Sequence, residues 1–215
     1  IARNPLEGFE RLYDGDRSGV LWLELHILQF MKGAPVEMQR ALILAIHTGQ
    51  RYGDLVRLRW SDYDGTHIRL KQRKTGAYVI VKVTAALKRM LDATPKTCPF
   101  ILARADGRPW HTEKNDKEMG KAFRKHMRDA GLYADDPKER MHFNDMRGTS
   151  VTLLAEAGCT VAEIVSITGH ALKSATQILE KYLARTQSIS DAAILKFENA
   201  PATDFANRLQ TAEAG

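Results

Sequence analysis

The sequence predicts one mainly helical α+β domain with a small three-stranded antiparallel sheet. Apolar residues recur at helical spacing through most of its 215 residues, and between residues 67 and 82 this period gives way to the alternation typical of strands. The hydrophobic content of 44% is that of an ordinary globular protein long enough to bury a substantial core. We expect a leader at residues 1–20, the domain at residues 21–198 and a flexible tail at residues 199–215.

Helices dominate the first quarter of the chain. Apolar spacing predicts a helix over residues 21–31 and a second helix after Pro35, which suits a first helical turn. The second helix is predicted to end near Gly49, a plausible C-cap. The stretch "RYGDLVRLRW" predicts a short third helix, and "SDYDG" a turn.

The sheet is predicted from the next stretch, "THIRLKQR". Ile68 and Leu70 fall on one side of this strand, whereas Arg69 and Lys71 fall on the other. "KTGA" turns the chain and "YVIVKV" continues as a strand, so a hairpin with a basic face is expected. The short run "PFIL" supplies the third strand.

Helices are predicted again for the second half of the chain, each from its start and stop signals. Thr84 is predicted to cap a helix over "AALKRMLDA", and a long polar helix is predicted between Thr112 and Gly131. A helix over residues 144–157 is predicted to stop at Gly158, and capping boxes at Thr160/Glu163 and Ser174/Gln177 predict the next two helices. A last helix is predicted from Ser190.

Charge is concentrated in the middle of the chain. The net charge is +6, and residues 51–90 hold ten Lys or Arg against three acidic residues. This pattern favours a polyanion such as nucleic acid over an ordinary lysine-rich surface. The chain has no apolar run of ~20 residues, no signal-peptide core and only two distant cysteines, Cys98 and Cys159, so we expect a cytoplasmic protein with no membrane contact, disulfide or zinc site.

Four polar clusters stand out, and each has an ordinary structural explanation when it is taken alone. Arg51 is then an exposed arginine and Lys74 a hairpin lysine. "FNDMRGT" is then a helix start capped by its Asn or Asp, with Arg147 on the surface. His170 is then a capping histidine after a glycine, and Tyr182 a packing tyrosine.

In this order, however, the clusters resemble the tyrosine recombinases, the phage integrase family. "TGQRYGDLVRLRWSDYD" is similar to the first arginine box of that family, "DMRGT" to its second, and "TGH" with "YLAR" to its third box and nucleophile. The resemblance covers residues 20–195. It implies the catalytic-domain fold of that family and an enzyme that breaks and rejoins DNA at specific sites through a 3′-phosphotyrosyl intermediate.

The resemblance also assigns roles to single residues. Tyr182 would attack the scissile phosphate, while Arg51 and Arg147 would hold its non-bridging oxygens with charge-assisted hydrogen bonds. His170 would donate a further hydrogen bond, and Lys74 would protonate the departing 5′ oxygen. The scheme needs no metal or other cofactor. Further expected residues are Asn144 in the catalytic set, Asp54 and His142 in support, and Lys71, Arg73 and Lys121 as contacts to DNA phosphates.

Two features depart from the family pattern. Asn144 stands where the family usually has a histidine and sometimes a lysine, and an amide neither takes nor gives a proton at neutral pH. His142 could compensate from a loop or strand, but not from a continuous helix. Tyr182 follows His170 by twelve residues rather than the usual nine, a difference close to one helical turn.

The family resemblance also implies partners. We expect double-stranded DNA, a homotetramer on DNA, a monomer or weak oligomer when free, and a location on the bacterial nucleoid. Residues 1–20 would be the linker from an N-terminal core-binding domain. Two alternatives stay open: a DNA-relaxing enzyme of the type IB topoisomerase kind, and an integrase-like DNA-binding protein that has lost catalysis, for which Asn144 would be the mark.

Overall fold

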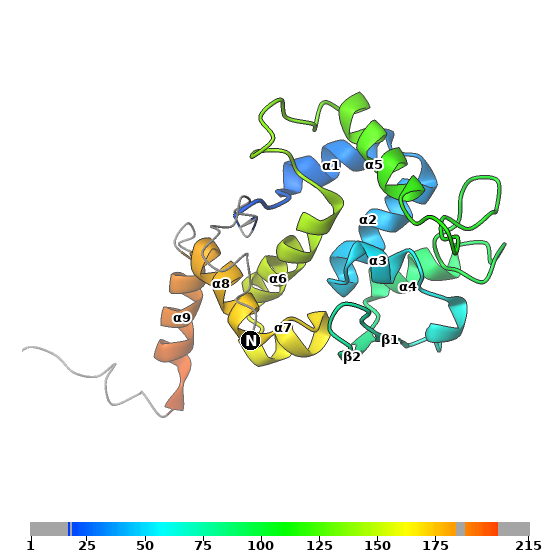
Figure 1. Ribbon diagram of the computed structural model, residues 1–215. Helices are drawn as coiled ribbons and strands as arrows, with labels where there is room; N and C mark the ends of the chain where they lie inside the picture. The colour runs from blue at the N-terminus through cyan, green and yellow to red at the C-terminus, as the bar shows by residue number, and fades with distance from the viewer. Residues whose placement is uncertain (1–16, 18, 184–187, 202–215) are drawn as a thin grey trace, which may run out of the picture.

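The computed structural model describes residues 17, 19–183 and 188–201. Most of the expected leader and tail therefore lies outside the described residues. The elements, coloured along the chain in Figure 1, are α1 (Glu24–Gly33), α2 (Val36–Thr48), α3 (Tyr52–Leu55), the 3₁₀ turn η1 (Trp60–Asp62), β1 (His67–Lys71), β2 (Tyr78–Lys82), α4 (Ala85–Asp92), α5 (Glu118–Asp129), the 3₁₀ turn η2 (Phe143–Asp145), α6 (Met146–Glu156), α7 (Val161–Thr168), α8 (Leu172–Leu183) and α9 (Ser188–Asn199).

The mainly helical α+β prediction is confirmed, but the sheet has two strands instead of three. β1 and β2 pair antiparallel, with Ile68 opposite Val81 and Leu70 opposite Val79. The run "PFIL" forms only an isolated bridge between Phe100 and Arg59. The third strand fails because this segment pairs with the loop after α3 instead of with the hairpin.

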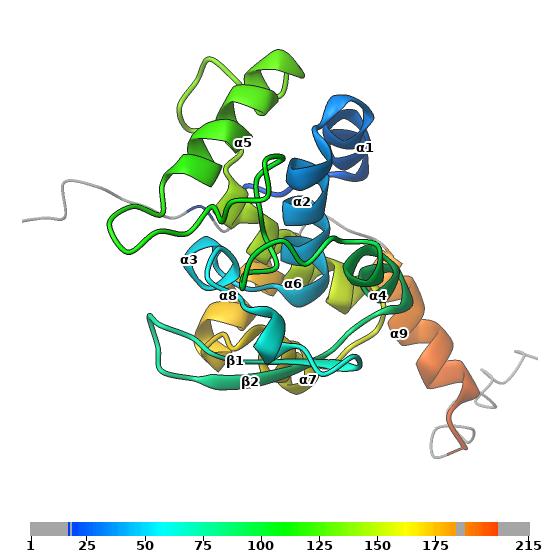
Figure 2. The ribbon, with the colours of Figure 1, turned by 90° about the vertical axis from the view of Figure 1, so that its right-hand side faces the viewer.

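Helix α6 lies at the centre of the described fold. It packs against α2 on one side and against α7 and α8 on the other, and α7 also contacts β2. The view in Figure 2 shows the β1–β2 hairpin at one edge with α7 behind it, while α1 and α5 lie at the opposite end. In both views α9 lies outside the packed body.

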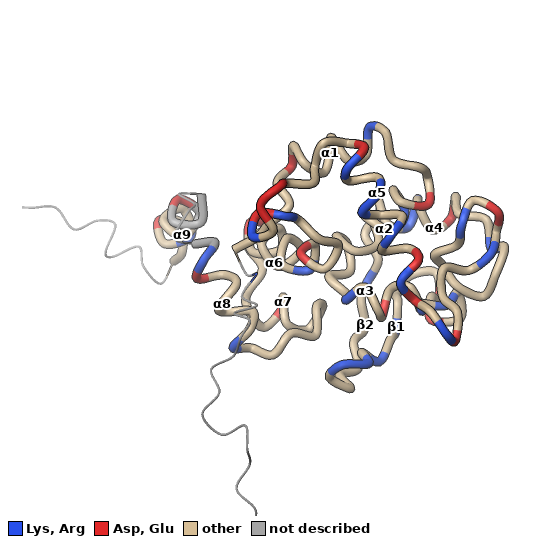
Figure 3. The backbone as a smooth tube through the Cα atoms, turned by 45° about the horizontal axis from the view of Figure 1, so that its top comes forward, with Lys and Arg blue, Asp and Glu red and all other residues tan. Residues whose placement is uncertain are grey.

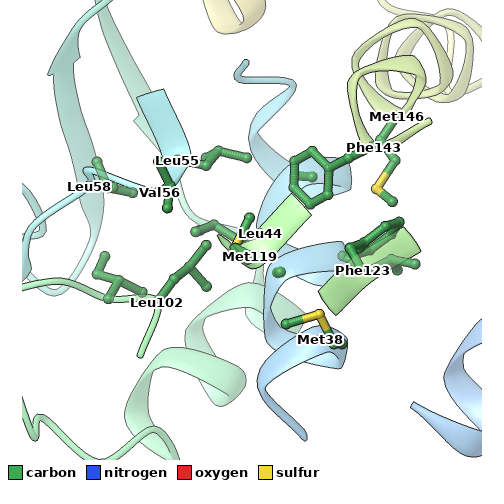
Figure 4. Packing of buried hydrophobic residues seen from close by; sticks show 14 of the residues in the cluster. Met38, Leu44, Leu55, Val56, Leu58, Leu102, Met119, Phe123, Phe143 and Met146 are labelled. Atoms are coloured by element: carbon green, nitrogen blue, oxygen red, sulfur yellow. The ribbon is translucent and has the colours of Figure 1, made fainter. Parts of the chain in front are cut away.

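The main hydrophobic core joins α2, α3, α5 and the start of α6. Figure 4 shows Leu44, Leu55 and Met119 together with Phe123 and Phe143 in this cluster. The Phe123 and Phe143 rings meet edge to face with centroids 5.1 Å apart, a favoured aromatic geometry. A smaller cluster lies between α6, α7 and α8. Both clusters hold α6 in place, and α6 begins with the turn that carries "FND".

Three predicted helix starts are wrong, and hydrogen bonding explains the first of them. The long polar helix begins at Glu118 and not after Thr112, because Thr112 and Asn115 form a side-chain-bonded turn that competes with the helix. Residues 143–145 form η2 instead of the first turn of one continuous helix. Helix α8 begins at Leu172, so Ser174 lies inside the helix and does not cap it.

Other local signals are confirmed. Thr84 caps α4 by accepting from the Leu87 amide, and Thr160 accepts from the Glu163 amide as the predicted capping box requires. Gly49 ends α2 in the left-handed region with φ 62°. No helix within the described residues is long and apolar enough to cross a membrane.

Candidate functional site

One pocket brings together four of the residues predicted to act on a phosphate. It has a volume of about 420 Å³ and is lined by Arg51, Gly53, Asp54, Arg73, Lys74, Asn144 and Arg147. These residues come from three separate elements: α3 with its N-cap, the β1–β2 turn and the η2–α6 junction. Four cationic side chains face a single carboxylate, so the pocket attracts anions. Figure 3 shows the Lys and Arg of the β1–β2 hairpin gathered toward its turn.

Arg147 is held in this pocket by the ends of two helices. Its Nη1 donates to the carbonyl oxygen of Gly49 and, at 2.6 Å, to that of Thr168. Gly49 caps the C-terminus of α2, and Thr168 is the last residue of α7. Helix C-termini carry partial negative charge and unsatisfied carbonyls, and both favour a guanidinium at this position.

The other terminal nitrogen of Arg147 is unpaired. Nη2 is buried, and it has no hydrogen-bond partner among the described residues. The Arg147 residue is only 7% exposed, and burial, with a contribution from Arg51, lowers its pKa from 12.5 to about 9. The group stays charged at neutral pH, and it has hydrogen-bonding capacity to spare for an anion.

Gly49 fits the contact with Arg147 because of its missing side chain. A Cβ at this position would lie 2.7 Å from Thr168 Cγ2 and 2.9 Å from Ser150 Oγ, in a backbone with φ +62°. The end of α2 therefore approaches both α6 and α7 closely. This close approach brings the Gly49 carbonyl to Arg147.

Arg51 is oriented by Gln72, which is not among the residues predicted for the site. Arg51 Nη1 donates to Gln72 Oε1 at 2.7 Å. Gln72 in turn donates to Gln50 Oε1 at 2.6 Å and to the Thr168 carbonyl at 2.7 Å. The signal was present in the sequence, since residue 72 continues the inward-facing parity of Ile68 and Leu70.

Asp54 lies behind the same pocket. Its Oδ1 accepts from the backbone amide of Arg73 at 3.0 Å, which ties α3 to the β1–β2 turn. Its Oδ2 is buried and lacks a hydrogen-bond partner among the described residues. Asp54 was predicted to support the site. In the structure its carboxylate contacts the backbone of the turn that holds Lys74.

Asn144 is exposed at the pocket and reaches across to α3. Its Oδ1 accepts from the Tyr52 amide at 3.4 Å, so it supplies an acceptor for the first turn of α3 and not for its own helix. Asp145 instead closes η2 by accepting from the His142 amide at 2.6 Å. Asp145 occupies the N-cap position of α6, but neither its side chain nor that of Asn144 accepts from an amide of α6, so the predicted side-chain cap is wrong for both residues.

His142 has the extended backbone that the compensation hypothesis required, with φ −121° and ψ 161°. It is not, however, among the residues that line the pocket. Its carbonyl accepts from Trp22 Nε1 at 3.2 Å, and burial, assisted by the charge of Arg17, lowers the pKa of its ring. His142 lies on the side of η2 that faces the segment before α1.

His170 lies within the electrostatic reach of both arginines. Burial, then the charges of Arg147 and Arg51, lower the pKa of His170 to about 3, so the free protein holds it neutral. Its Nδ1 lies 2.9 Å from Thr168 Oγ1, and that hydroxyl donates its proton to the Ile164 carbonyl at 2.7 Å. Nδ1 is therefore the protonated nitrogen, and Nε2 carries a lone pair.

The predicted nucleophile and the predicted DNA contacts are placed less completely. Tyr182 belongs to the last turn of α8, but its side chain lies outside the described residues. Nine residues after His170, where the family pattern would have a tyrosine, stands the buried Leu179. Arg73 lines the pocket and is exposed, and Lys71 is exposed on β1 near it, whereas Lys121 on α5 pairs with Glu118 at 2.8 Å. The described residues contain no group of three or more His, Cys, Asp or Glu suited to a metal ion.

Comparisons with known proteins agree with this arrangement. The model of the phage integrase family matches residues 24–187. The integrase of Escherichia phage HK022 is 32% identical over 128 residues, which are 55% of this chain and 34% of that protein. The chain therefore spans about a third of the length of that relative.

Solved structures share the fold. The lambda integrase catalytic core has a TM-score of 0.59 at 24% identity, over 70% of this chain and 91% of that chain. A lambda integrase tetramer bound to a Holliday junction has a TM-score of 0.58 at 24% identity, over 70% of this chain and 46% of that chain. From the family model and the shared fold, the chain is a member of the phage integrase family.

Proposed function

We propose that this chain is the catalytic domain of a site-specific recombinase that cuts and rejoins double-stranded DNA through a 3′-phosphotyrosyl intermediate. The observation that carries the proposal is the buried, unpaired Nη2 of Arg147 in a pocket shared with Arg51 and Lys74. Leaving a cationic donor buried without a partner costs stability, and such groups occur where a substrate supplies the partner. A phosphate with its non-bridging oxygens is the anion that two forked guanidiniums bind best.

The proposed step forms one bond and breaks one. The phenolic oxygen of Tyr182 bonds to the phosphorus, and the bond from phosphorus to the 5′ oxygen breaks. Lys74 gives a proton to that oxygen, and the phenol loses its own proton to solvent because Asn144 cannot accept it. Arg51 and Arg147 neutralise the charge that gathers on the non-bridging oxygens in the transition state. Reversal of the same step with another DNA end rejoins the strand.

His170 enters this scheme through its protonation state. Burial and, after it, the charges of Arg147 and Arg51 lower the pKa of His170 in the free protein. A bound phosphate would offset the two charges and so raise the pKa of His170, which favours the form protonated at Nε2 that can donate the hydrogen bond implied by the family pattern. Lys71 and Arg73 would contact neighbouring phosphates, so binding is expected to weaken steeply with salt.

The assembly proposed for DNA is a homotetramer. A lambda integrase structure that shares the fold is a tetramer bound to a Holliday junction. A recombinase that exchanges strands between two duplexes has four strands to cut, which four copies of this site would provide.

The test uses duplexes nicked near the cleavage site, so that the cut strand loses a short fragment and cannot be rejoined. A library of such duplexes with randomised arms is incubated with the protein, and covalent adducts are isolated from denaturing gels and sequenced. The expected result is a defined family of sequences attached through Tyr182, and none with the Tyr182→Phe variant. Binding of duplex without any adduct would contradict the proposal and favour the DNA-binding alternative that Asn144 suggests.

A further inference from the structure

The side chain of Gln72 connects Arg51 at the start of α3, the β1–β2 turn and the end of α7. It follows the last residue of β1 and is fully buried. We propose that Gln72 is a positioning residue for the reaction, which fixes Arg51 and couples it to the Lys74 turn and to the Thr168–His170 turn. The inference rests on the proposed function, because it concerns the same pocket.

All four hydrogen-bonding positions of the Gln72 amide are used. Oε1 accepts from Arg51 Nη1 at 2.7 Å and from Thr75 Oγ1 at 2.9 Å. Nε2 donates to Gln50 Oε1 at 2.6 Å and to the Thr168 carbonyl at 2.7 Å. A neutral amide offers two acceptor and two donor positions, so no other natural side chain of this length satisfies this set.

The backbone of Gln72 closes the turn that presents Lys74. Its amide donates to the Ala77 carbonyl at 2.7 Å, and its carbonyl accepts from the Gly76 amide at 2.8 Å. The Thr75 hydroxyl, inside this turn, is bonded to the same Gln72 side chain. A shift of residue 72 therefore moves the turn that carries Lys74 together with Arg51.

The Thr168 carbonyl connects Gln72 to the second arginine. It accepts both from Gln72 Nε2 and from Arg147 Nη1 at 2.6 Å. Arg51 is thus connected to the Thr168 carbonyl by two hydrogen bonds through Gln72, and Arg147 is connected to the same carbonyl by one hydrogen bond. The arrangement sets the spacing of the two guanidiniums that bracket the phosphate.

Gly169 leaves the space that the side chain of Gln72 occupies. A Cβ at Gly169 would lie 2.5 to 2.9 Å from the amide atoms of Gln72, and the glycine has φ +64°. The turn between Thr168 and His170 therefore packs directly on the Gln72 amide, and only glycine allows that approach. His170 is held one residue away from this contact.

Three variants test the inference in the protein as it exists. Gln72→Leu removes all four bonds, whereas Gln72→Glu keeps the shape and the two accepting positions but loses the donors when it is ionised. Gln39→Leu is the matched control, because Gln39, in α2, donates to the Met31 and Ala34 carbonyls at the end of α1, away from the pocket. Circular dichroism first establishes that each variant is folded at the assay temperature.

The readout is single-turnover adduct formation on the nicked-duplex library, with a double-mutant cycle against Arg51→Ala. We expect Gln72→Leu to slow adduct formation by about 10–100-fold with DNA affinity within about twofold, the size of effect that follows from misplacing catalytic groups. Gln39→Leu should match wild type. If Gln72 acts through Arg51, the double variant loses little more than Arg51→Ala alone.

The Gln72→Glu variant adds a pH signature. Its carboxyl regains a donor when protonated, so its rate relative to wild type should rise as the pH falls. Any of three results would overturn the inference. The rate losses of Gln72→Leu and Arg51→Ala could multiply in the double variant, the rate of Gln72→Glu relative to wild type could be independent of pH, or Gln72→Leu could form adduct as fast as Gln39→Leu.

A second measurement separates this inference from the proposed function. Inorganic sulfate serves as the probe of the arginine pair, and its Kd is measured by calorimetry for the same cycle. Should the wild-type protein form no adduct, the proposed function fails, but non-additive sulfate affinities would still support Gln72 as the residue that positions Arg51. Additive affinities would overturn the inference whether or not the protein cleaves DNA.

Discussion

Replacing Arg147 by methionine is expected to stabilise the free protein while it abolishes DNA cleavage. The Arg147 side chain is buried, its Nη2 is unpaired among the described residues, and burial lowers its pKa from 12.5 to about 9. Methionine fills a similar volume without a charge to desolvate. The substitution therefore separates the free-energy cost of burying the guanidinium from its proposed role in DNA cleavage.

The magnitude follows from the pKa shift and the bonds lost. A shift of this size corresponds to a cost of about 5 kcal/mol at about 1.4 kcal/mol per pKa unit. The variant leaves the Gly49 carbonyl without this donor, which returns about 1–3 kcal/mol, whereas the Thr168 carbonyl keeps its bond from Gln72. A net gain of about 2–4 kcal/mol raises Tm by roughly 4–16 °C for a domain of this size, at about 2–4 °C per kcal/mol.

The assay is thermal unfolding with and without sulfate. Wild type should gain stability with sulfate, by about 2.7 kcal/mol at a hundred times Kd, while Arg147→Met gains nothing. Arg108→Met is the control, since Arg108 is exposed and pairs with Asp106, and its Tm should stay within about 2 °C of wild type. A Tm of Arg147→Met below that of wild type would refute the reasoning, because it would show that the carbonyl bonds outweigh the cost of burial.

Three further changes bear on the same pocket. Asn144→His should raise the adduct rate or leave it unchanged, because the histidine adds an ionisable group; a loss above about tenfold would show that the bond to the start of α3 matters more. Lys74→Ala should slow cleavage by about 10²–10⁴-fold, and a duplex with sulfur as the bridging 5′ atom should restore it, since a thiolate leaves without a proton; absence of rescue would exclude Lys74 as the acid. The stability that neutral His170 contributes is complete above pH 6.5 and is lost as the pH falls toward about 3. The free energy of unfolding of wild type should therefore fall more steeply over that pH range than that of His170→Gln. Parallel curves for the two proteins would contradict this expectation.

Features that depend on near neighbours in the chain were predictable. Thr84, Thr160 and Gly49 end or start their helices as predicted, because a cap is decided by residues within one turn. The β1–β2 hairpin follows from alternation around a short turn. The order of the two arginines, the lysine and the histidine along the chain carried the resemblance to the family.

Features that depend on distant partners were not predictable in the same way. The acceptor role of Asn144 involves the Tyr52 amide, 92 residues away in the chain, and no local pattern encodes that contact. The third strand failed because the run at Phe100 bridges to Arg59. The alternation of β1 predicts that Gln72 faces inward. Its function, however, can be inferred only once its hydrogen-bond partners at the start of α3 and the end of α7 are known.

The arginines of the pocket are held by neutral groups. Carbonyls at the ends of α2 and α7 bind Arg147, and the Gln72 amide binds Arg51, while no described carboxylate forms an ion pair with either guanidinium. Dipoles fix a cation without cancelling its charge. The free site should therefore attract a small anion from the buffer, which, under the proposed function, a DNA phosphate would displace. The affinity for DNA would then depend on which anion the buffer contains as well as on its concentration, and we expect binding to tighten when glutamate replaces chloride at constant ionic strength.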